Sequence, residues 1–235
     1  MFTGLIREIG SLRRITSGAD LTKLVISAPK TAPTMGLGDS LAVNGICLTV
    51  VAMDRTTVTV EAAAETRRLT TLKRWRVGQP LHLEPALRAG QALDGHLVQG
   101  HIDGTGKVSG LRKQGGSLFL TVTCGPDLVR WLMPKGSVAV DGVSLTVDAG
   151  PHRDRFTVNI IPHTLQWTYF DRLRQGQVVN LEMDVLVKAA RTGQPASAFS
   201  GLNSNLETQG TAPSKKRAPS MAYILDRGFG RKGTS

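Results

Sequence analysis

Cysteine and histidine are the residues of this chain whose side chains could most directly take part in chemistry. The two cysteines, Cys47 and Cys124, lie far apart and outside any Cys-X-X-Cys spacing. This argues against a zinc site and against the dense disulfides of a small secreted scaffold. For Cys47 a reactive thiol or plain burial remains, since free cysteine often packs as a small hydrophobe. We expect Cys124 in the core because it lies outside the motifs described below.

Five histidines are present, and His101 is the best candidate for a general acid or base. An unperturbed imidazole titrates near ~6.5 and can exchange protons at neutral pH. His96 lies five residues earlier, but no third His, Cys or carboxylate has a spacing that would complete a metal site. We therefore predict no metal, and we expect His82 and His152 at the surface.

The chain contains an internal repeat that covers most of its length. Residues 38–50 return as residues 135–147 at an offset of 97, and residues 2–10 return as residues 98–106 at an offset of 96. Segments nearer the end of each unit repeat at an offset of 98. Because the offset drifts by only two residues across the unit, the pattern indicates a tandem duplication.

The duplication predicts two domains, residues 1–96 and 97–188, followed by a tail over residues 189–235. The units differ where their roles should differ. Cys47 of the first unit corresponds to Ser144 of the second, inside otherwise nearly identical segments. A serine at the end of a strand can also serve only to bind backbone groups, so both a functional and a structural interpretation remain open at Ser144.

Short strands dominate both units. Asn44-Gly45 and Asp141-Gly142 each separate two apolar runs, which is typical of a tight hairpin turn. Long stretches with a 3.6-residue period are nearly absent. The pattern predicts an all-β fold in which each unit is a small closed antiparallel barrel. Short helices are expected at residues 31–36, 127–133 and 184–191.

The net charge of +11 raises the question of nucleic-acid binding. The tail holds seven Lys or Arg and two acidic residues, so that it supplies +5 of the total. It is rich in Gly, Ser, Pro and Thr without a sustained period, and we expect it to be disordered. Nucleic-acid-binding barrels would interleave aromatic and basic residues on their strands, a pattern that this sequence lacks. We predict no specific nucleic-acid partner.

The sequence contains no segment that we expect to enter a membrane. No uninterrupted apolar run approaches the ~20 residues of a membrane-spanning helix. The N-terminal residues lack the basic, then apolar, then small order of a secretory signal. We expect a cytoplasmic protein.

Five motifs together carry a resemblance to a known family. They are Met1-Phe-Thr-Gly-Leu-Ile6, Val43-Asn-Gly-Ile-Cys-Leu-Thr-Val50, Gly95-His-Leu-Val-Gln-Gly-His-Ile-Asp-Gly-Thr-Gly106, Val140-Asp-Gly-Val-Ser-Leu-Thr-Val147 and Asn159-Ile-Ile-Pro-His-Thr-Leu165. In their order and spacing they resemble the riboflavin synthase family. The resemblance extends from the first residue to about residue 190.

The resemblance implies a fold, an assembly and a reaction. It implies two six-stranded Greek-key barrels per chain, a C-terminal helix that assembles a homotrimer, and no metal or organic cofactor. The implied reaction is a dismutation of two molecules of 6,7-dimethyl-8-ribityllumazine. One molecule gives a four-carbon unit to the other, which yields riboflavin and 5-amino-6-ribitylaminouracil.

The resemblance also assigns roles to four candidate catalytic residues. Cys47 and Ser144 match the family's nucleophiles or nucleophile-activating groups, with hydroxide from water as the competing nucleophile. His101 is the implied general acid or base. Asp184 matches a carboxylate that orients substrate or relays a proton, against the alternative of a solvated acid at the end of a strand.

Further residues are implied to contact substrate. By the resemblance, Thr49 and Thr146 make paired polar contacts to the pteridine or the ribityl group. Lys135 places a charge near the ring, and His163 lies at the rim of the pocket. The expectation that Phe2 and Thr3 fold over a pocket competes equally with an ordinary first strand in the core. The full set of expected substrate-binding residues is Phe2, Thr3, Gly4, Ser40, Thr49, Glu65, Gly100, Lys135, Thr146, His163 and Thr164.

A second functional class remains possible, because lumazine proteins and related flavin binders resemble this family without turning the pteridine over. The joint presence of Cys47, His101, Ser144 and Asp184 favours the enzyme, since a pure binder need not keep these groups. The expected C-terminal helix is only about two turns long, which is too short for a stable isolated coiled coil. The trimer is therefore a weaker expectation than the fold.

Overall fold

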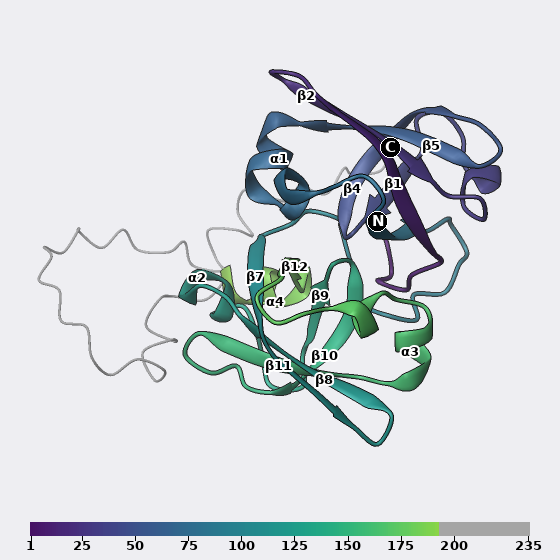
Figure 1. Ribbon diagram of the computed structural model, residues 1–235. Helices are drawn as coiled ribbons and strands as arrows, with labels where there is room; N and C mark the ends of the chain where they lie inside the picture. Colours follow the sequence, from purple (N-terminus) through teal and green to yellow (C-terminus); the bar gives the residue numbers. More distant parts are fainter. Residues whose placement is uncertain (193–235) are drawn as a thin grey trace, which may run out of the picture. The chain divides into compact units, whose positions relative to one another are not determined.

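The computed structural model describes residues 1–192, which form two closed six-stranded barrels (Figure 1). The expected disordered part of the tail, from residue 193 onward, lies outside the described residues. The fold predicted from the repeat is confirmed: both barrels are antiparallel and have the same strand order along the chain.

The first barrel, purple to blue in Figure 1, closes in the order β1-β2-β5-β4-β3-β6. This order is that of a Greek key, because β5 lies between β2 and β4 while β6 returns to β1. Its strands are β1 Glu8–Ser17, β2 Leu21–Ser27, β3 Ser40–Val43, β4 Ile46–Met53, β5 Thr57–Ala63 and β6 Pro80–Pro85. Its helical segments are η1 Ala32–Thr34, α1 Ala64–Leu69 and η2 Thr71–Arg74.

The second barrel, teal to green in Figure 1, closes in the order β10-β11-β8-β7-β12-β9, which is the same topology. Its strands are β7 Gly104–Gln114, β8 Ser117–Thr123, β9 Ser137–Val140, β10 Val143–Ala149, β11 Arg155–Ile160 and β12 Val178–Met183. Its helical segments are α2 Pro126–Val129, α3 Pro162–Gln166, η3 Phe170–Arg172 and α4 Val185–Thr192.

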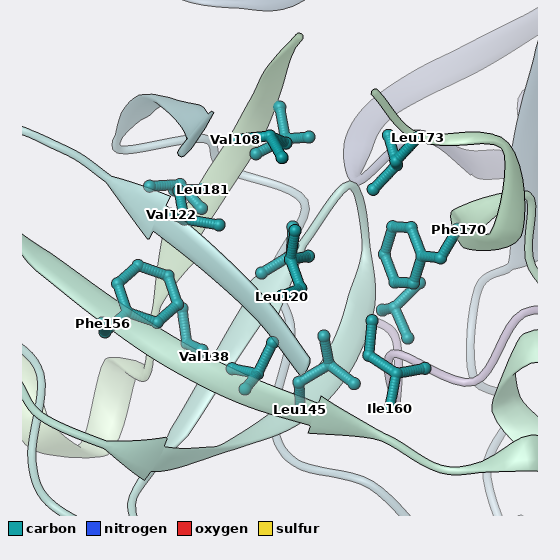
Figure 2. Packing of buried hydrophobic residues seen from close by; sticks show 14 of the residues in the cluster. Val108, Leu120, Val122, Val138, Leu145, Phe156, Ile160, Phe170, Leu173 and Leu181 are labelled. Carbon is teal, nitrogen blue, oxygen red and sulfur yellow. The ribbon is translucent and has the colours of Figure 1, made fainter. Parts of the chain in front are cut away.

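The core of each barrel is made by the inward-facing side chains of its strands. In the second barrel, shown in Figure 2, all six strands contribute side chains to one apolar cluster. Cys124 belongs to this cluster and is 7% exposed, as expected from the sequence. The labelled members in Figure 2 are Val108, Leu120, Val122, Val138, Leu145, Phe156, Ile160, Phe170, Leu173 and Leu181.

Three expected helices are present with shifted bounds. Residues 31–36 contain only the short segment η1, and α2 begins one residue before the expected range and ends at Val129, whereas α4 covers Val185–Thr192. The sequence pattern missed α1, which follows β5 directly, and α3, which follows β11 after one residue. With five or six residues each, they are too short for a helical period to emerge from the neighbouring strands.

The segments before β1 and β7 join the two barrels reciprocally. Ile6, just before β1, packs in the core cluster of the second barrel, and Ile102, just before β7, packs against that of the first. Between them, Phe2 and Val98 form an antiparallel bridge with hydrogen bonds in both directions, of 2.7 and 3.1 Å. An isoleucine from the other repeat therefore packs with the core of each barrel.

A buried polar network also joins the barrels, and His82 lies at its centre. The expectation that His82 is at the surface is wrong, since the residue is fully buried. The amide N–H of Tyr169 donates to its Nε2 at 3.0 Å, so Nδ1 carries the proton and donates to the carbonyl oxygen of Asp141 at 3.0 Å. Backbone groups of the opposite barrel thus satisfy both ring nitrogens, which allows the neutral ring to be buried.

Within residues 1–192, no helix has the length and apolar character needed to cross a membrane.

Candidate functional site

Two equivalent strand faces carry the candidate nucleophiles. In β4 the side chains of Ile46, Leu48 and Val50 are buried, whereas Cys47 is half-buried and Thr49 is exposed. This alternation follows from the two-residue period of a strand, and it places the thiol on the outer face of the barrel. In the second barrel β10 repeats the pattern, with Ser144 half-buried and Thr146 exposed.

The hairpin turns before these strands explain the shared geometry. Asn44 and Gly45 have φ angles of 47° and 79°, and Asp141 and Gly142 have φ angles of 43° and 80°. Positive φ at both central residues is characteristic of a type I′ hairpin turn, which sets the register of the flanking strands. The outer face therefore begins at the same place in both barrels, two residues after the glycine.

The reciprocal joining of the barrels brings His101 to the same barrel as Cys47. The amide N–H of Cys47 donates to the carbonyl oxygen of Gly100 at 2.9 Å. A Cβ added at Gly100 would lie only 2.5 Å from the Cβ of Cys47, so the two backbones can approach this closely only with glycine. His101 follows directly and is exposed, which places it at the edge of the first barrel's face although it belongs to the second repeat.

The corresponding position on the second barrel is built by residues near the N-terminus. The amide N–H of Ser144 donates to the carbonyl oxygen of Gly4 at 2.8 Å. Beside it, Nδ1 of His96 lies 2.7 Å from Oγ of Ser144, and the amide N–H of His96 donates to the carbonyl oxygen of Thr3 at 3.2 Å. Ser144 thus has a histidine as its direct hydrogen-bond partner.

His96 has the environment of a proton-transfer group. The residue is 9% exposed, and its Nε2 is buried without a hydrogen-bond partner among residues 1–192. Burial lowers the pKa of His96, while the nearby negative charge of Asp184 acts in the opposite direction. The imidazole is therefore neutral near pH 7 and can accept a proton. The sequence analysis considers His96 only as a metal ligand. Its place after Gly95 in the motif of residues 95–106 is the signal that could have identified it.

Two buried glutamates support the segments that border the candidate nucleophiles. Glu84 on β6 accepts hydrogen bonds from the amides of Thr3 and Gly4, and Glu182 on β12 accepts them from the amides of Gln99 and Gly100. Burial raises the pKa of Glu84, and it raises the pKa of Glu182 to about 7. In both cases the amide donors partly offset this effect.

The other expected substrate-binding residues are distributed over both faces. Ser40 lies opposite Thr49 in the β3–β4 pair, and the second barrel repeats this with Ser137 opposite Thr146. Glu65 on α1 is exposed and forms an ion pair with Arg68 at 2.6 Å.

Three further expected residues lie in the second barrel. His163 and Thr164 are on α3, which follows β11; His163 is exposed and Thr164 is half-buried. Lys135 pairs with Asp148 at 2.9 Å. Asp148 lies four residues beyond Ser144, about 13 Å along the strand, so this charge is distant from the serine.

Phe2 and Thr3 are buried in the joint between the barrels. Phe2 is fully buried in a small cluster with Ala42, Val98 and Ala139. Thr3 is 1% exposed, and its hydroxyl donates to Glu84 at 2.7 Å. Both side chains are therefore part of the packing between the barrels.

The described part of the chain, residues 1–192, contains no group of three or more His, Cys, Asp or Glu side chains that could hold a metal ion.

Comparison with known proteins assigns both halves of the described chain to one family. The family described as "Lumazine binding domain" matches residues 3–86 and again residues 99–184. The riboflavin synthase of Actinobacillus pleuropneumoniae is 37% identical over 188 residues, which cover 80% of this chain and 87% of that protein. The chain belongs to the riboflavin synthase family. The riboflavin synthase of Brucella abortus is 38% identical over 200 residues, 83% of this chain and 98% of its own length.

Solved structures show the same fold as this member of the riboflavin synthase family. The structure of LumP complexed with riboflavin has a TM-score of 0.72 at 24% identity. The match covers 78% of this chain and 99% of the LumP chain. LumP complexed with 6,7-dimethyl-8-(1'-D-ribityl) lumazine has a TM-score of 0.70 at 23% identity. At this identity the likeness concerns the fold alone.

Proposed function

We propose that this chain is a riboflavin synthase that converts two molecules of 6,7-dimethyl-8-ribityllumazine into riboflavin and 5-amino-6-ribitylaminouracil. A four-carbon unit leaves one lumazine and joins the other, so that the two products together contain all atoms of the two substrates. Residues of the chain supply the acid and the base, the nucleophile is a side chain or hydroxide from water, and no cofactor takes part.

The observation that carries this proposal is the pair of similar but chemically different faces. Cys47 with neighbouring His101 marks the first face, and Ser144 with His96 marks the second. Two identical substrates must play different roles in a dismutation, one as donor and one as acceptor. Two related faces with different reactive groups meet that need, and holding both substrates in place would supply the orientation that a bimolecular step requires.

The polar groups at the second face suit the proton transfers of the reaction. A proton must leave an acidified methyl group of lumazine, and a nucleophile must add to the electron-poor ring. A neutral His96 can accept a proton while it is hydrogen-bonded to Ser144 at 2.7 Å. The negative charge of Asp184 stabilises the imidazolium that results. On the first face, the thiol of Cys47 and the imidazole of His101 supply the corresponding groups.

We further propose that the productive site forms between the first barrel of one subunit and the second barrel of a neighbouring subunit in a homotrimer. On α4, Leu186 is 65% exposed within the chain, and Val185 is half-buried. These side chains would be covered by a neighbouring subunit, which would bring the faces of different chains together.

The test is incubation of the purified protein with 6,7-dimethyl-8-ribityllumazine, with riboflavin followed by absorbance and fluorescence. The expected result is continuous formation of riboflavin with two lumazines consumed for each riboflavin. The double variant Cys47→Ser/Ser144→Ala serves as the control and should form riboflavin much more slowly. Any other ratio of lumazine to riboflavin would contradict the dismutation.

The competing function is binding of lumazine or flavin without turnover, as the likeness to LumP in fold suggests. A binder would change the fluorescence of lumazine to a saturating level and form no riboflavin. This outcome in the same experiment would replace the enzyme by the binder.

A further inference from the structure

Glu84 and Glu182 occupy equivalent places on the last strands of the two barrels. Both carboxylate oxygens of each residue accept a backbone hydrogen bond. Glu84 accepts from the amides of Thr3 at 2.7 Å and Gly4 at 3.0 Å. Glu182 accepts from the amides of Gln99 at 2.6 Å and Gly100 at 2.9 Å.

The segments held in this way also border the opposite barrel, at the strand that carries the candidate nucleophile. Gly4, held by Glu84 of the first barrel, accepts the amide hydrogen bond of Ser144 in the second barrel. Gly100, held by Glu182 of the second barrel, accepts the amide hydrogen bond of Cys47 in the first. The support is therefore crossed: each barrel's glutamate fixes the edge of the other barrel's face.

The carboxylate is suited to this task for a physical reason. Glu84 is 4% exposed and Glu182 is 2% exposed, so water cannot replace a lost partner. The amide donors favour the ionised form of each carboxylate against the effect of burial on its pKa. That form accepts hydrogen bonds at both oxygens without presenting a donor of its own. A glutamine of the same size would turn an NH₂ group toward one of the two amide donors, and that donor would lose its partner.

We infer that Glu84 is a positioning residue for the Ser144 face and Glu182 a positioning residue for the Cys47 face, each acting through the segment it holds on the opposite barrel. The effect of the two glutamates on backbone order does not depend on the proposed function. Their effect on lumazine binding rests on it. His101 follows Gly100 directly, so Glu182 also controls where that imidazole lies.

The two supports differ in strength. Glu84 receives a third hydrogen bond, from the hydroxyl of Thr3 at 2.7 Å. The equivalent position in the second repeat is Gln99, which donates to Glu182 through its backbone amide. The segment beside Cys47 should therefore open more easily than the segment beside Ser144.

Thiol labelling tests the crossed arrangement without any ligand. The background is Cys124→Ala, which leaves Cys47 as the reporter for the first face; the second reporter is Ser144→Cys with Cys47→Ser. Since loss of a buried hydrogen bond raises local opening, Glu182→Gln should speed maleimide labelling of Cys47 by about tenfold. Glu84→Gln should change that rate by less than about twofold, because its segment lies on the other face.

The second reporter should show the opposite order. Labelling at Ser144→Cys should accelerate in Glu84→Gln and remain near its starting rate in Glu182→Gln. Circular dichroism and thermal unfolding establish that each variant is folded. If a Gln variant does not fold, Glu182→Asp or Thr3→Val provides a milder change. Each should still speed labelling only at the reporter on the opposite barrel from the glutamate. Equal acceleration at both reporters, or acceleration on the glutamate's own barrel, would overturn the inference.

Titration with 6,7-dimethyl-8-ribityllumazine, followed by its fluorescence, then connects the supports to binding. Each Glu→Gln variant should weaken binding at one face and preserve it at the other. If the variants show crossed labelling but the wild-type protein binds no lumazine, the positioning roles stand and the proposed function is contradicted. Unchanged binding at both faces in both variants would overturn the link between these glutamates and substrate.

Discussion

Nδ1 of His96 lies 2.7 Å from Oγ of Ser144, although the two residues are 48 positions apart and belong to different structural segments. His96 is held there by its own amide, which donates to Thr3. The imidazole is buried and Nε2 has no partner among residues 1–192, so this ring has one nitrogen on the serine and one without a protein partner. Such an arrangement is typical of a residue that transfers protons.

Replacement of His96 by Gln should lower kcat for riboflavin formation by about tenfold or more, where each tenfold equals ~1.4 kcal/mol of transition-state stabilisation. The reason is that glutamine can hydrogen-bond Ser144 but cannot take up a proton. KM should change much less than kcat. Steady-state kinetics measure both constants. The control is His152→Gln, since His152 is exposed on a loop of the second barrel, and its kinetics should match wild type.

Replacement of Gly100 by Ala should destabilise the protein and impair the Cys47 face. The new Cβ would lie 2.5 Å from the Cβ of Cys47, at a backbone φ of 81°. The matched control is Gly78→Ala, where φ is 88° and nothing lies within 4 Å of the added Cβ. Both variants suffer the strained φ, and only Gly100→Ala adds a clash, so it should cost about 1–3 kcal/mol more in unfolding free energy. Denaturant unfolding would refute this if both variants lost the same amount.

The burial of His82 predicts a particular pH dependence of stability. Burial lowers the pKa of His82 from 6.5 to about 3, so between these values the unfolded chain binds a proton that the folded chain does not. The stability that His82 contributes is therefore present above pH 6.5 and is lost as pH falls toward 3. The slope is ~1.4 kcal/mol per pH unit.

Asp141 acts in the opposite direction, because burial raises its pKa to about 7 and its contribution is lost as pH rises toward that value. Because the two effects oppose each other in wild type, the contribution of His82 must be measured as a difference in unfolding free energy between two proteins. The unfolding free energy of wild type minus that of His82→Asn, which inserts the residue found at the equivalent Asn180, should shrink as pH falls from 6.5 to 4. A difference that stays constant over this range would show that His82 is not held neutral.

Assembly should depend on the short helix α4. Leu186 is 65% exposed in the chain, and a subunit contact would bury it. If the productive site lies between subunits, specific activity should fall on dilution as trimers dissociate, and Leu186→Asp should shift this fall to higher protein concentration. Leu37→Asp, at an even more exposed leucine remote from α4 in sequence, is the control. Constant specific activity at dilutions where light scattering detects only monomer would place catalysis within one chain.

Local sequence determined the barrels and the faces. The offset of the repeat and the Asn44-Gly45 and Asp141-Gly142 turns place Cys47 and Ser144 at equivalent positions. The two-residue alternation that the structure shows in β4 and β10 turns both side chains outward. These features depend only on neighbours along the chain, because the side-chain period of a strand and the φ preferences of a turn are local properties. The order of strands within each barrel came from the resemblance to a known family.

The partners of the reactive groups were decided only by the tertiary structure. An alignment of the repeats places His101 in the second unit and gives no reason to pair it with Cys47. In the structure, the segment before β7 crosses to the first barrel and brings His101 to the face that carries Cys47. His96 reaches Ser144, and His82 is buried, for the same reason: their hydrogen-bond partners belong to the other barrel. Whether a polar side chain is exposed, buried or reactive depends on which distant backbone groups satisfy it, and no periodicity along one chain segment records that.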